Sequence, residues 1–165
     1  MPFERSAVRI WKRLSWEERL AAARHFWAEP PPDAAPAARA AVARALRSRP
    51  QAVGKLPLER RAQGLASVLQ PVEVLAAALL VSLHLGERRP LLAAFLDGVG
   101  LPHHEGLMPE DAPGGAVGEA AARAGYEAVA DRFPEEHVWT YLNTLWLQDH
   151  DRWAVLEQVV WGDGA

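Results

Sequence analysis

The 165-residue chain contains no cysteine, and this absence excludes several classes of protein. Without thiols there is no disulfide framework, no Cys-ligated zinc, no iron–sulfur cluster and no thiol nucleophile. Long apolar runs are also lacking. The longest, Val72 to Leu85, has 14 residues and includes Glu73 and His84, so it is too short to span a bilayer. Charged residues interrupt the N-terminal stretch, so we expect no signal peptide, no membrane association and a soluble, cytoplasmic protein.

Lysine is scarce, with 2 residues against 16 arginines, whereas alanine (31) and proline (13) are abundant. This combination is typical of the compositional bias of a source genome, such as a bacterial one. Arginine abundance alone is therefore weak support for phosphate binding.

No segment alternates apolar and polar residues in the way a half-buried strand requires, and helical patterns are dense. The sequence predicts an all-α fold. We expect one domain over residues 1–165, a compact bundle of about eight or nine short helices. These are arranged as helical hairpins around one apolar central helix, 72–85, because a helix that is apolar on nearly every side is buried on nearly every side.

Helix boundaries are marked by caps and prolines. Ser15 followed by Glu18 predicts a capping box, and the three prolines from Pro30 predict the end of that helix. Further helix starts are expected at residue 4, near Pro36, and at Pro57, Pro90, Pro134 and Asp149, with Pro50 and Gly54 in a connection. Gly86 and Gly98 are expected to end helices.

Residues 99–115 form the one long irregular stretch, rich in glycine and proline. Long loops in compact domains are more often functional than short connections are. Two alanine-dense helices, expected over 36–48 and 116–132, permit close approach of a neighbouring helix. In the second of these, Gly118 and Gly125 are predicted to let another backbone come close.

Charge is divided along the chain. Residues 1–89 hold 15 Lys/Arg against 8 Asp/Glu, whereas residues 90–165 hold 3 against 13, which gives the net charge of −3. This division can attract an acidic partner or nucleic acid to the basic half. Alternatively, the two halves complement each other internally or form two solvated faces.

The glycine-rich loop contains His103-His104-Glu105, with Glu110 and Asp111 close behind. Imidazoles and carboxylates are the ligands that zinc, iron, nickel or manganese use. Neighbouring ligands from one loop rarely chelate without a partner elsewhere, and the spacing matches no metal motif. We therefore expect no metal or other cofactor, and interpret the two histidines as solvated or structurally hydrogen-bonded.

His84, near the end of the apolar helix, is followed by Arg88 and Arg89. A histidine there is favoured by the helix dipole. A second interpretation joins these three residues to the His103-His104-Glu105 loop as one polar patch, in which paired arginines could hold an anion or an acidic side chain. The six residues are the candidate ligand- or partner-binding set.

Seven tryptophans are several times the number expected from average composition. Trp139, Trp146 and Trp153 recur every seven residues, although Asp149 to Asp151 should break the helix between them. Core packing explains such residues, and a partner surface is the alternative, since tryptophans often anchor interfaces.

Catalytic signatures are missing: no phosphate-binding loop, no Gly-x-Ser-x-Gly elbow and no His-Glu-x-x-His occurs. Our first hypothesis is a small, non-catalytic interaction or regulatory module that binds another protein, or itself, through a tryptophan-bearing or charged surface. The alternative is a small-ligand or metal-binding helical protein, which could be an enzyme, that uses the six-residue patch.

Nucleic-acid binding is a third hypothesis, which the overall acidity and the lack of a helix-turn-helix glycine turn disfavour. It would use the basic residues Arg39, Arg44, Arg47, Arg49, Lys55, Arg60 and Arg61.

Overall fold

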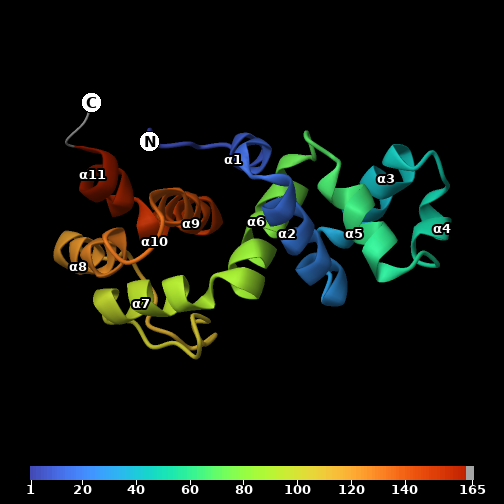
Figure 1. Ribbon diagram of the computed structural model, residues 1–165. Coiled ribbons are helices and arrows are strands. Elements are labelled where there is room, and N and C mark those ends of the chain that lie inside the picture. Colours follow the sequence, from blue (N-terminus) through green and yellow to red (C-terminus); the bar gives the residue numbers. More distant parts are fainter. Residues whose placement is uncertain (163–165) are drawn as a thin grey trace. The chain divides into compact units, whose positions relative to one another are not determined.

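The computed structural model describes residues 1–162, so the last three residues of the predicted domain, 163–165, lie outside the described part. The described residues form eleven helices and no strand, which confirms the all-α fold (Figure 1). The helices group into two compact units. The 6–87 unit holds residues 6–87, and the 88–162 unit holds residues 88–162 together with residues 1–5. The expectation of a single domain stays a prediction.

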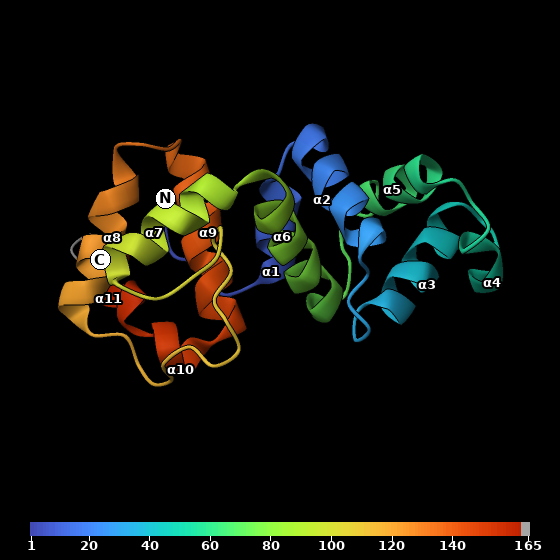
Figure 2. The ribbon, with the colours of Figure 1, turned by 90° about the horizontal axis from the view of Figure 1, so that it is seen from below.

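Six helices build the 6–87 unit (Figure 2). They are α1 (Ala7–Arg13), α2 (Trp16–Ala28), α3 (Ala35–Ala45), α4 (Pro50–Val53), α5 (Leu58–Ala66) and α6 (Glu73–Glu87). α2 packs against both α5 and α6, α1 packs on α6, and α3 contacts α4, α5 and α6. The predicted capping box opens α2: Glu18 N–H donates to Ser15 Oγ (3.1 Å) and Ser15 N–H donates to Glu18 Oε2 (2.8 Å).

The core of this unit contains the apolar face of α6, where Leu79 and Leu80 are completely buried. Trp11 joins it from α1, and its Nε1 donates to the main-chain oxygen of Val68 (2.8 Å). The first turn of α6 departs from the prediction, because Val74 is 53% exposed. This helix is therefore buried on most sides along its length but open at its N-terminal end.

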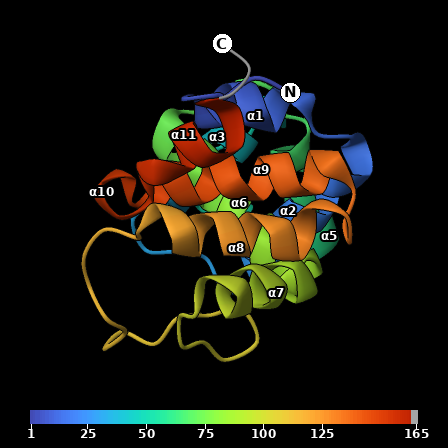
Figure 3. The ribbon, with the colours of Figure 1, turned by 90° about the vertical axis from the view of Figure 1, so that its left-hand side faces the viewer.

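The 88–162 unit contains the other five helices, of which α7, α8 and α9 lie one above another in Figure 3. They are α7 (Arg89–Val99), α8 (Glu119–Ala130), α9 (Glu135–Gln148), α10 (His150–Trp153) and α11 (Val155–Trp161). α8 packs against α7, α9 and α11. At its centre the Phe95 ring meets the rings of Tyr141 and Trp153, at centroid distances of 5.5 and 5.6 Å. Burial raises the pKa of the Tyr141 phenol above its ordinary value.

Several predicted boundaries are wrong for identifiable reasons. The first helix begins at Ala7 rather than residue 4, because Ser6 caps it by accepting from Arg9 N–H and residues 1–5 join the other unit. Pro50 to Val53 form a helical turn instead of a connection. Gly86 does not end a helix but lies inside α6. Gly98 likewise lies inside α7, and the residue that caps the end of α7 is Gly100, which has a left-handed conformation (φ 82°).

The C-terminal region also divides more finely than expected. Asp149 caps a helix as predicted, since its side chain accepts from Arg152 N–H, but that helix is only the four-residue α10. α11 follows it as a separate helix. The four-residue helices α4 and α10 raise the number of helices in the described residues above the predicted eight or nine. Within residues 1–162 we find no helix with the length and apolar character that crossing a lipid bilayer requires.

Candidate functional site

The six residues of the predicted polar patch are shared between the two units. His84 is buried on the last turn of α6, whereas the other five belong to the 88–162 unit. The structure does bring Arg89 to the loop, because its Nη1 donates to the main-chain oxygen of Glu105 (3.4 Å). His104 and Glu105 are exposed, and Arg88 is buried at the cap of α7. That all six form one binding patch stays a prediction.

His103 is held by hydrogen bonds on both ring nitrogens. Gly106 N–H donates to Nδ1 (3.1 Å), so the proton lies on Nε2, which donates to Asp97 Oδ1 (2.8 Å). A ring nitrogen engaged in this way is not available to a metal unless a bond breaks. Among the described residues no group of three or more His, Asp or Glu side chains is placed to hold a metal ion.

The loop around His103 is a tight turn fixed to α7. The main-chain groups of His104 and Leu107 exchange hydrogen bonds of 2.8 and 3.0 Å around Glu105 (φ 49°) and Gly106 (φ 84°). Any Cβ at Gly106 would lie 2.6 Å from Leu92 Cβ, so only glycine fits. The histidines therefore belong to a structural turn.

Basic residues are concentrated in α3, α4, α5 and their connections in the 6–87 unit, and we call the exposed surface of this segment the basic face. Residues 35–66 contain seven cations and a single carboxylate, Glu59, which is paired with Arg24 (2.6 Å). Six of the cations are exposed and make no ion pair or side-chain hydrogen bond with any described residue: Arg39, Arg44, Arg47, Arg49, Lys55 and Arg60. Arg61 differs, because its guanidinium lies over the Trp27 ring at 5.4 Å.

Beside the basic face lies a groove of about 300 Å³, which we call the alanine groove. One wall is the face of α3 made of small residues at helical spacing, with Arg44 among them. The other wall is the connection from Ser67 to Val72 and the start of α6. The residues that line it are Ala37, Ala40, Ala41, Arg44, Ala45, Ser67, Val68, Gln70, Pro71, Val72 and Leu75.

Apolar side chains are exposed around the alanine groove. Val72, on its wall, is 59% exposed, and the nearby chain positions Leu69 and Val74 are 45% and 53% exposed. The sequence predicts that the alanine-dense helix permits a close neighbour. In the structure, this face of α3 lines the groove within the 6–87 unit.

The tryptophans mostly serve as core residues. Four of the seven are buried: Trp11, Trp27, Trp139 and Trp153. Trp16 is exposed (42%), and the other two are half-buried. The predicted break in the tryptophan seam is confirmed, because α9 ends at Gln148, before Trp153. Core packing therefore explains four of the seven, whereas Trp146 and Trp161 are half-buried and take part in a second groove.

This second groove, the α9–α11 groove, holds residues 1–5 of the chain itself. Trp139 Nε1 donates to the main-chain oxygen of Pro2 (2.7 Å), and Trp161 Nε1 donates to that of Met1 (3.1 Å). The main-chain N–H of Glu4 donates to Oδ1 of the completely buried Asn143 (2.8 Å). Three side chains thus bind the main chain of an extended segment.

Two side chains of the segment are bound as well. The Phe3 ring lies between the rings of Trp146 and Trp161, at centroid distances of 4.9 and 4.8 Å. The Arg5 guanidinium contacts Glu157 (3.0 Å) and lies 5.7 Å from the centre of the Trp146 ring. An aromatic and a basic residue are therefore recognised two positions apart.

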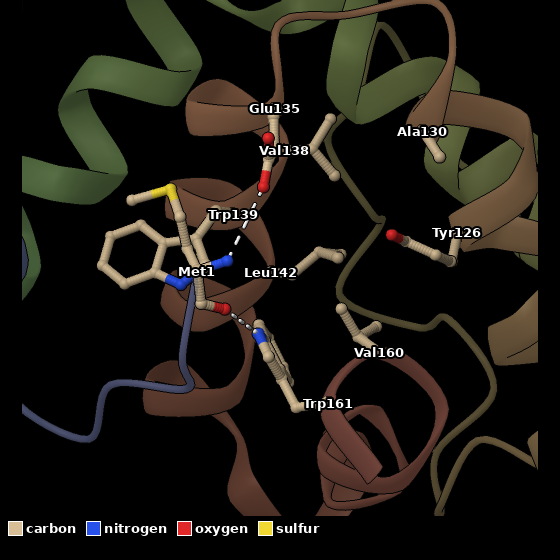
Figure 4. Close-up of a pocket in the computed structure, with 9 residues that line it drawn as sticks. All are labelled: Met1, Tyr126, Ala130, Glu135, Val138, Trp139, Leu142, Val160 and Trp161. Atoms are coloured by element: carbon tan, nitrogen blue, oxygen red, sulfur yellow. Dashed lines mark hydrogen bonds and ion pairs between the residues drawn. The ribbon is translucent and has the colours of Figure 1, made fainter. Parts of the chain in front are cut away.

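Next to Met1 the α9–α11 groove is not filled. A cavity of about 100 Å³ remains there. Figure 4 shows that the Tyr126 hydroxyl points into it and that the Glu135 carboxylate lies beside it. Trp139, Leu142 and Trp161 supply apolar walls. The cavity thus combines aromatic surface with a carboxylate.

Sequence reasoning finds neither groove. The alanine groove has a signal in the spacing of Ala37, Ala41 and Ala45, which is that of one helix face, but nothing in this pattern shows whether a helix covers the face. The α9–α11 groove has a signal in Trp139, Asn143 and Trp146, which share a face of α9. Residues 1–5 carry no pattern that indicates where they bind.

No family model, curated protein or solved structure matches the chain.

Proposed function

We propose that this protein is a small, non-catalytic interaction module that binds an acidic, amphipathic helix of another protein in the alanine groove. The observation that carries the proposal is a mostly apolar groove lined by Arg44, in a segment whose six exposed cations have no ion partner among the described residues. The apolar side of such a helix would lie on the alanines. Its carboxylates would meet Arg44 and the neighbouring arginines.

Shape supports a helix as the occupant. Small residues at the contact allow two helix axes to approach closely, and Ala37, Ala41 and Ala45 repeat every four residues along α3. Val72, at the edge, offers exposed apolar surface to the same ligand. Helix-in-groove recognition uses this arrangement of apolar anchors at helical spacing.

Charge supports an acidic partner. The 6–87 unit carries 12 Lys/Arg against 7 Asp/Glu, and the excess is concentrated on the basic face. Complementary charge raises the association rate and selects among partners more than it adds affinity. We therefore expect binding to weaken as salt rises, without disappearing.

Backbone strain at Arg47 also supports a role for the basic face. This residue has a left-handed conformation (φ 50°) directly after α3, where glycine is the favoured residue. Non-glycine residues in this conformation cost free energy and often occur at functional sites.

The absence of aromatic residues favours a protein over a nucleic acid. Residues 35–75 contain no Phe, Tyr or Trp, so the basic face offers no side chain on which bases could stack. The alanine groove is lined mostly by apolar residues, with Arg44 as its one cation, which suits a helix better than a chain of phosphates. We place the interaction in the cytoplasm, where a domain without disulfides is ordinary.

The test uses a designed peptide of about 18 residues with leucines at helical spacing and glutamates elsewhere, and a scrambled peptide of equal composition. Calorimetric titration of the full chain at about 150 mM salt should give micromolar affinity for the amphipathic peptide and much weaker binding of the scrambled one. We expect Ala41→Glu, which places a carboxylate in the groove, to weaken binding by at least about tenfold.

Matched variants identify the site. Arg44→Glu should weaken binding more than Arg60→Glu, because only Arg44 lines the groove. Ala120→Glu adds the same charge at an exposed position on α8 and should leave binding unchanged. Equal binding of both peptides, or equal effects of Ala41→Glu and Ala120→Glu, would contradict the proposal.

A further inference from the structure

The α9–α11 groove holds residues 1–5 in the way that a peptide-binding site holds a ligand. Trp139, Trp161 and Asn143 bind main-chain groups of the segment. Recognition of main-chain groups accepts many sequences, and pockets for individual side chains then supply specificity. In this groove the side chains that are contacted are Phe3, by two tryptophan rings, and Arg5, by Glu157 and the Trp146 ring.

The spacing of the groove fits an extended peptide. Trp139 and Asn143 are one turn apart on α9, a rise of about 6 Å. The groups that they bind, on Pro2 and Glu4, are two residues apart in an extended chain, or about 7 Å. Two side chains one helix turn apart therefore bind main-chain groups two residues apart in the segment. Another peptide of this length can place its main-chain groups at the same spacing.

The unfilled cavity shows that residues 1–5 do not use the whole site. At the position of Met1 about 100 Å³ remains open, and the Tyr126 hydroxyl and the Glu135 carboxylate line this space (Figure 4). Glu135 Oε1 lies 3.6 Å from the Met1 nitrogen. A long basic side chain at this position would fill the cavity, lie against the tryptophan rings and reach the carboxylate.

We infer that the α9–α11 groove is a second binding site, for an extended segment of another protein with a basic residue, then proline and an aromatic residue, and a second basic residue two positions later. Residues 1–5 are an intramolecular ligand of this site that matches the pattern at every position except the first. Because they are tethered, they occupy the groove at high effective concentration, so the partner must bind better than they do.

The same segment lowers the apparent affinity of the partner. A site that is mostly occupied in cis binds a competitor in proportion to the fraction of molecules in which it is free. Weakening residues 1–5 should therefore strengthen partner binding. This behaviour distinguishes a peptide site from a purely structural contact.

The experiment uses the full chain and three acetylated, amidated pentapeptides: Lys-Pro-Phe-Glu-Arg, Met-Pro-Phe-Glu-Arg and Glu-Pro-Phe-Glu-Arg. The receptor is a variant with a weakened segment, Phe3→Gly with Arg5→Ser. Calorimetry should show that the Lys peptide binds this variant about tenfold more tightly than the Met peptide, and that the Glu peptide binds most weakly. The unaltered chain should bind the Lys peptide at least about tenfold more weakly than the variant does.

Two further substitutions locate binding in the groove. Glu135→Gln should remove most of the preference for Lys over Met. Trp161→Phe keeps an aromatic ring but loses the N–H that donates to the main chain, so it should weaken the binding of all three peptides. Trp16→Phe, at an exposed tryptophan of the 6–87 unit, is the matched control and should change nothing.

Each outcome supports or overturns the second site. If the double variant is folded by circular dichroism and binds the three peptides equally, or binds none, the inference is wrong. If the double variant does not fold, Arg5→Ala replaces it, because this single change removes only the exposed Arg5 side chain, with its ion pair to Glu157 and its contact with the Trp146 ring, and leaves Phe3 in place. With that variant, the same order of affinities supports the inference. If excess Lys peptide fails to displace residues 1–5, the inference is contradicted.

Discussion

Gly98 and Gly125 are where α7 and α8 come closest. A Cβ at Gly98 would lie 2.9 Å from the main-chain oxygen of Ala124, and one at Gly125 would lie 2.5 Å from Val99 Cγ2. We predict that Gly98→Ala lowers the free energy of unfolding by about 1–3 kcal/mol, because backbone atoms must move apart. Urea denaturation measures this change. Gly114→Ala, with no atom near the added methyl, should stay within about 0.5 kcal/mol of the unaltered chain, and a similar loss in both would contradict the prediction.

The strain at Arg47 gives a prediction of the opposite sign. The residue follows α3 in the left-handed conformation, and Ser48 N–H donates to the main-chain oxygen of Ala43 (2.8 Å), which closes the helix end. Arg47→Gly should raise the free energy of unfolding by about 1 kcal/mol, since glycine adopts this conformation without steric cost. Thermal denaturation measures the change. A variant that is less stable than the unaltered chain would refute the conformational argument. Separately, the same variant should bind the acidic peptide more weakly, because it lacks the arginine's charge.

The exposed pair of Arg24 and Glu59 predicts a pH effect. The hydrogen bond from Arg24 holds the pKa of the Glu59 carboxyl below its ordinary value of 4.5. A lowered pKa in the folded state stabilises it above the ordinary pKa, and this contribution is lost as pH falls through the lowered value. NMR titration should show Glu59 ionising below pH 4.5, and Arg24→Gln should raise its pKa. Arg60→Gln, which removes a cation without an ion pair, should not.

Single residues also show what the sequence can predict. The Ser15–Glu18 capping box is confirmed because both partners lie within one turn, so local spacing alone determines the contact. Gly125 is confirmed as a point of close approach, whereas Gly118 precedes α8 and has nothing near it. The difference depends on which face of α8 meets α7, and this is a tertiary fact that the sequence pattern does not contain.

Among the helices, α6 carries the clearest prediction. Leu79 and Leu80 are completely buried, so truncating either removes apolar contacts and leaves a cavity. Leu79→Ala or Leu80→Ala should lower the free energy of unfolding by about 2–5 kcal/mol, as followed by urea denaturation. Val74→Ala, on the exposed first turn, is the control and should cost less than about 0.5 kcal/mol. Losses that small at both leucines would show that α6 is peripheral.

Helix starts are better predicted than helix ends and neighbours. Pro57 and Pro134 occupy the caps of α5 and α9 as expected, since proline is suited to the first positions of a helix. The start of α1 is misplaced because residues 1–5 bind tryptophans about 135 to 160 positions away in the chain. A contact of that separation leaves no periodic signal, so the binding of residues 1–5 in the α9–α11 groove could not be predicted.

At the scale of the whole molecule, the predicted charge division corresponds to the two units. The 6–87 unit has an excess of 5 positive charges, whereas residues 1–5 and 88–162 together hold 6 Lys/Arg against 13 Asp/Glu. Composition is summed along the chain, so a sequence reveals the division. It does not reveal that six cations of residues 35–66 lack ion partners among the described residues, because pairing depends on distances between helices.

Those unpaired cations allow the protein and nucleic-acid hypotheses to be separated. An exposed basic patch that binds phosphates releases counterions, so its affinity falls steeply with salt. Near 150 mM salt we predict no sub-micromolar binding to DNA or RNA, because the basic face has no aromatic side chain and its groove is apolar. Fluorescence anisotropy with labelled single- and double-stranded oligonucleotides measures this.

The matched variant is the double reversal Arg44→Glu with Arg47→Glu. Because both arginines are exposed and have no carboxylate partner among the described residues, the reversal should change the free energy of unfolding by less than about 1 kcal/mol. A larger loss would show that the two arginines interact with acidic groups of the same chain. Sub-micromolar binding to an oligonucleotide that the reversal abolishes would make nucleic acid the ligand of the basic face. We expect the folded double variant to lose acidic-peptide binding, and we expect neither chain to bind an oligonucleotide, because the groove beside Arg44 is mostly apolar.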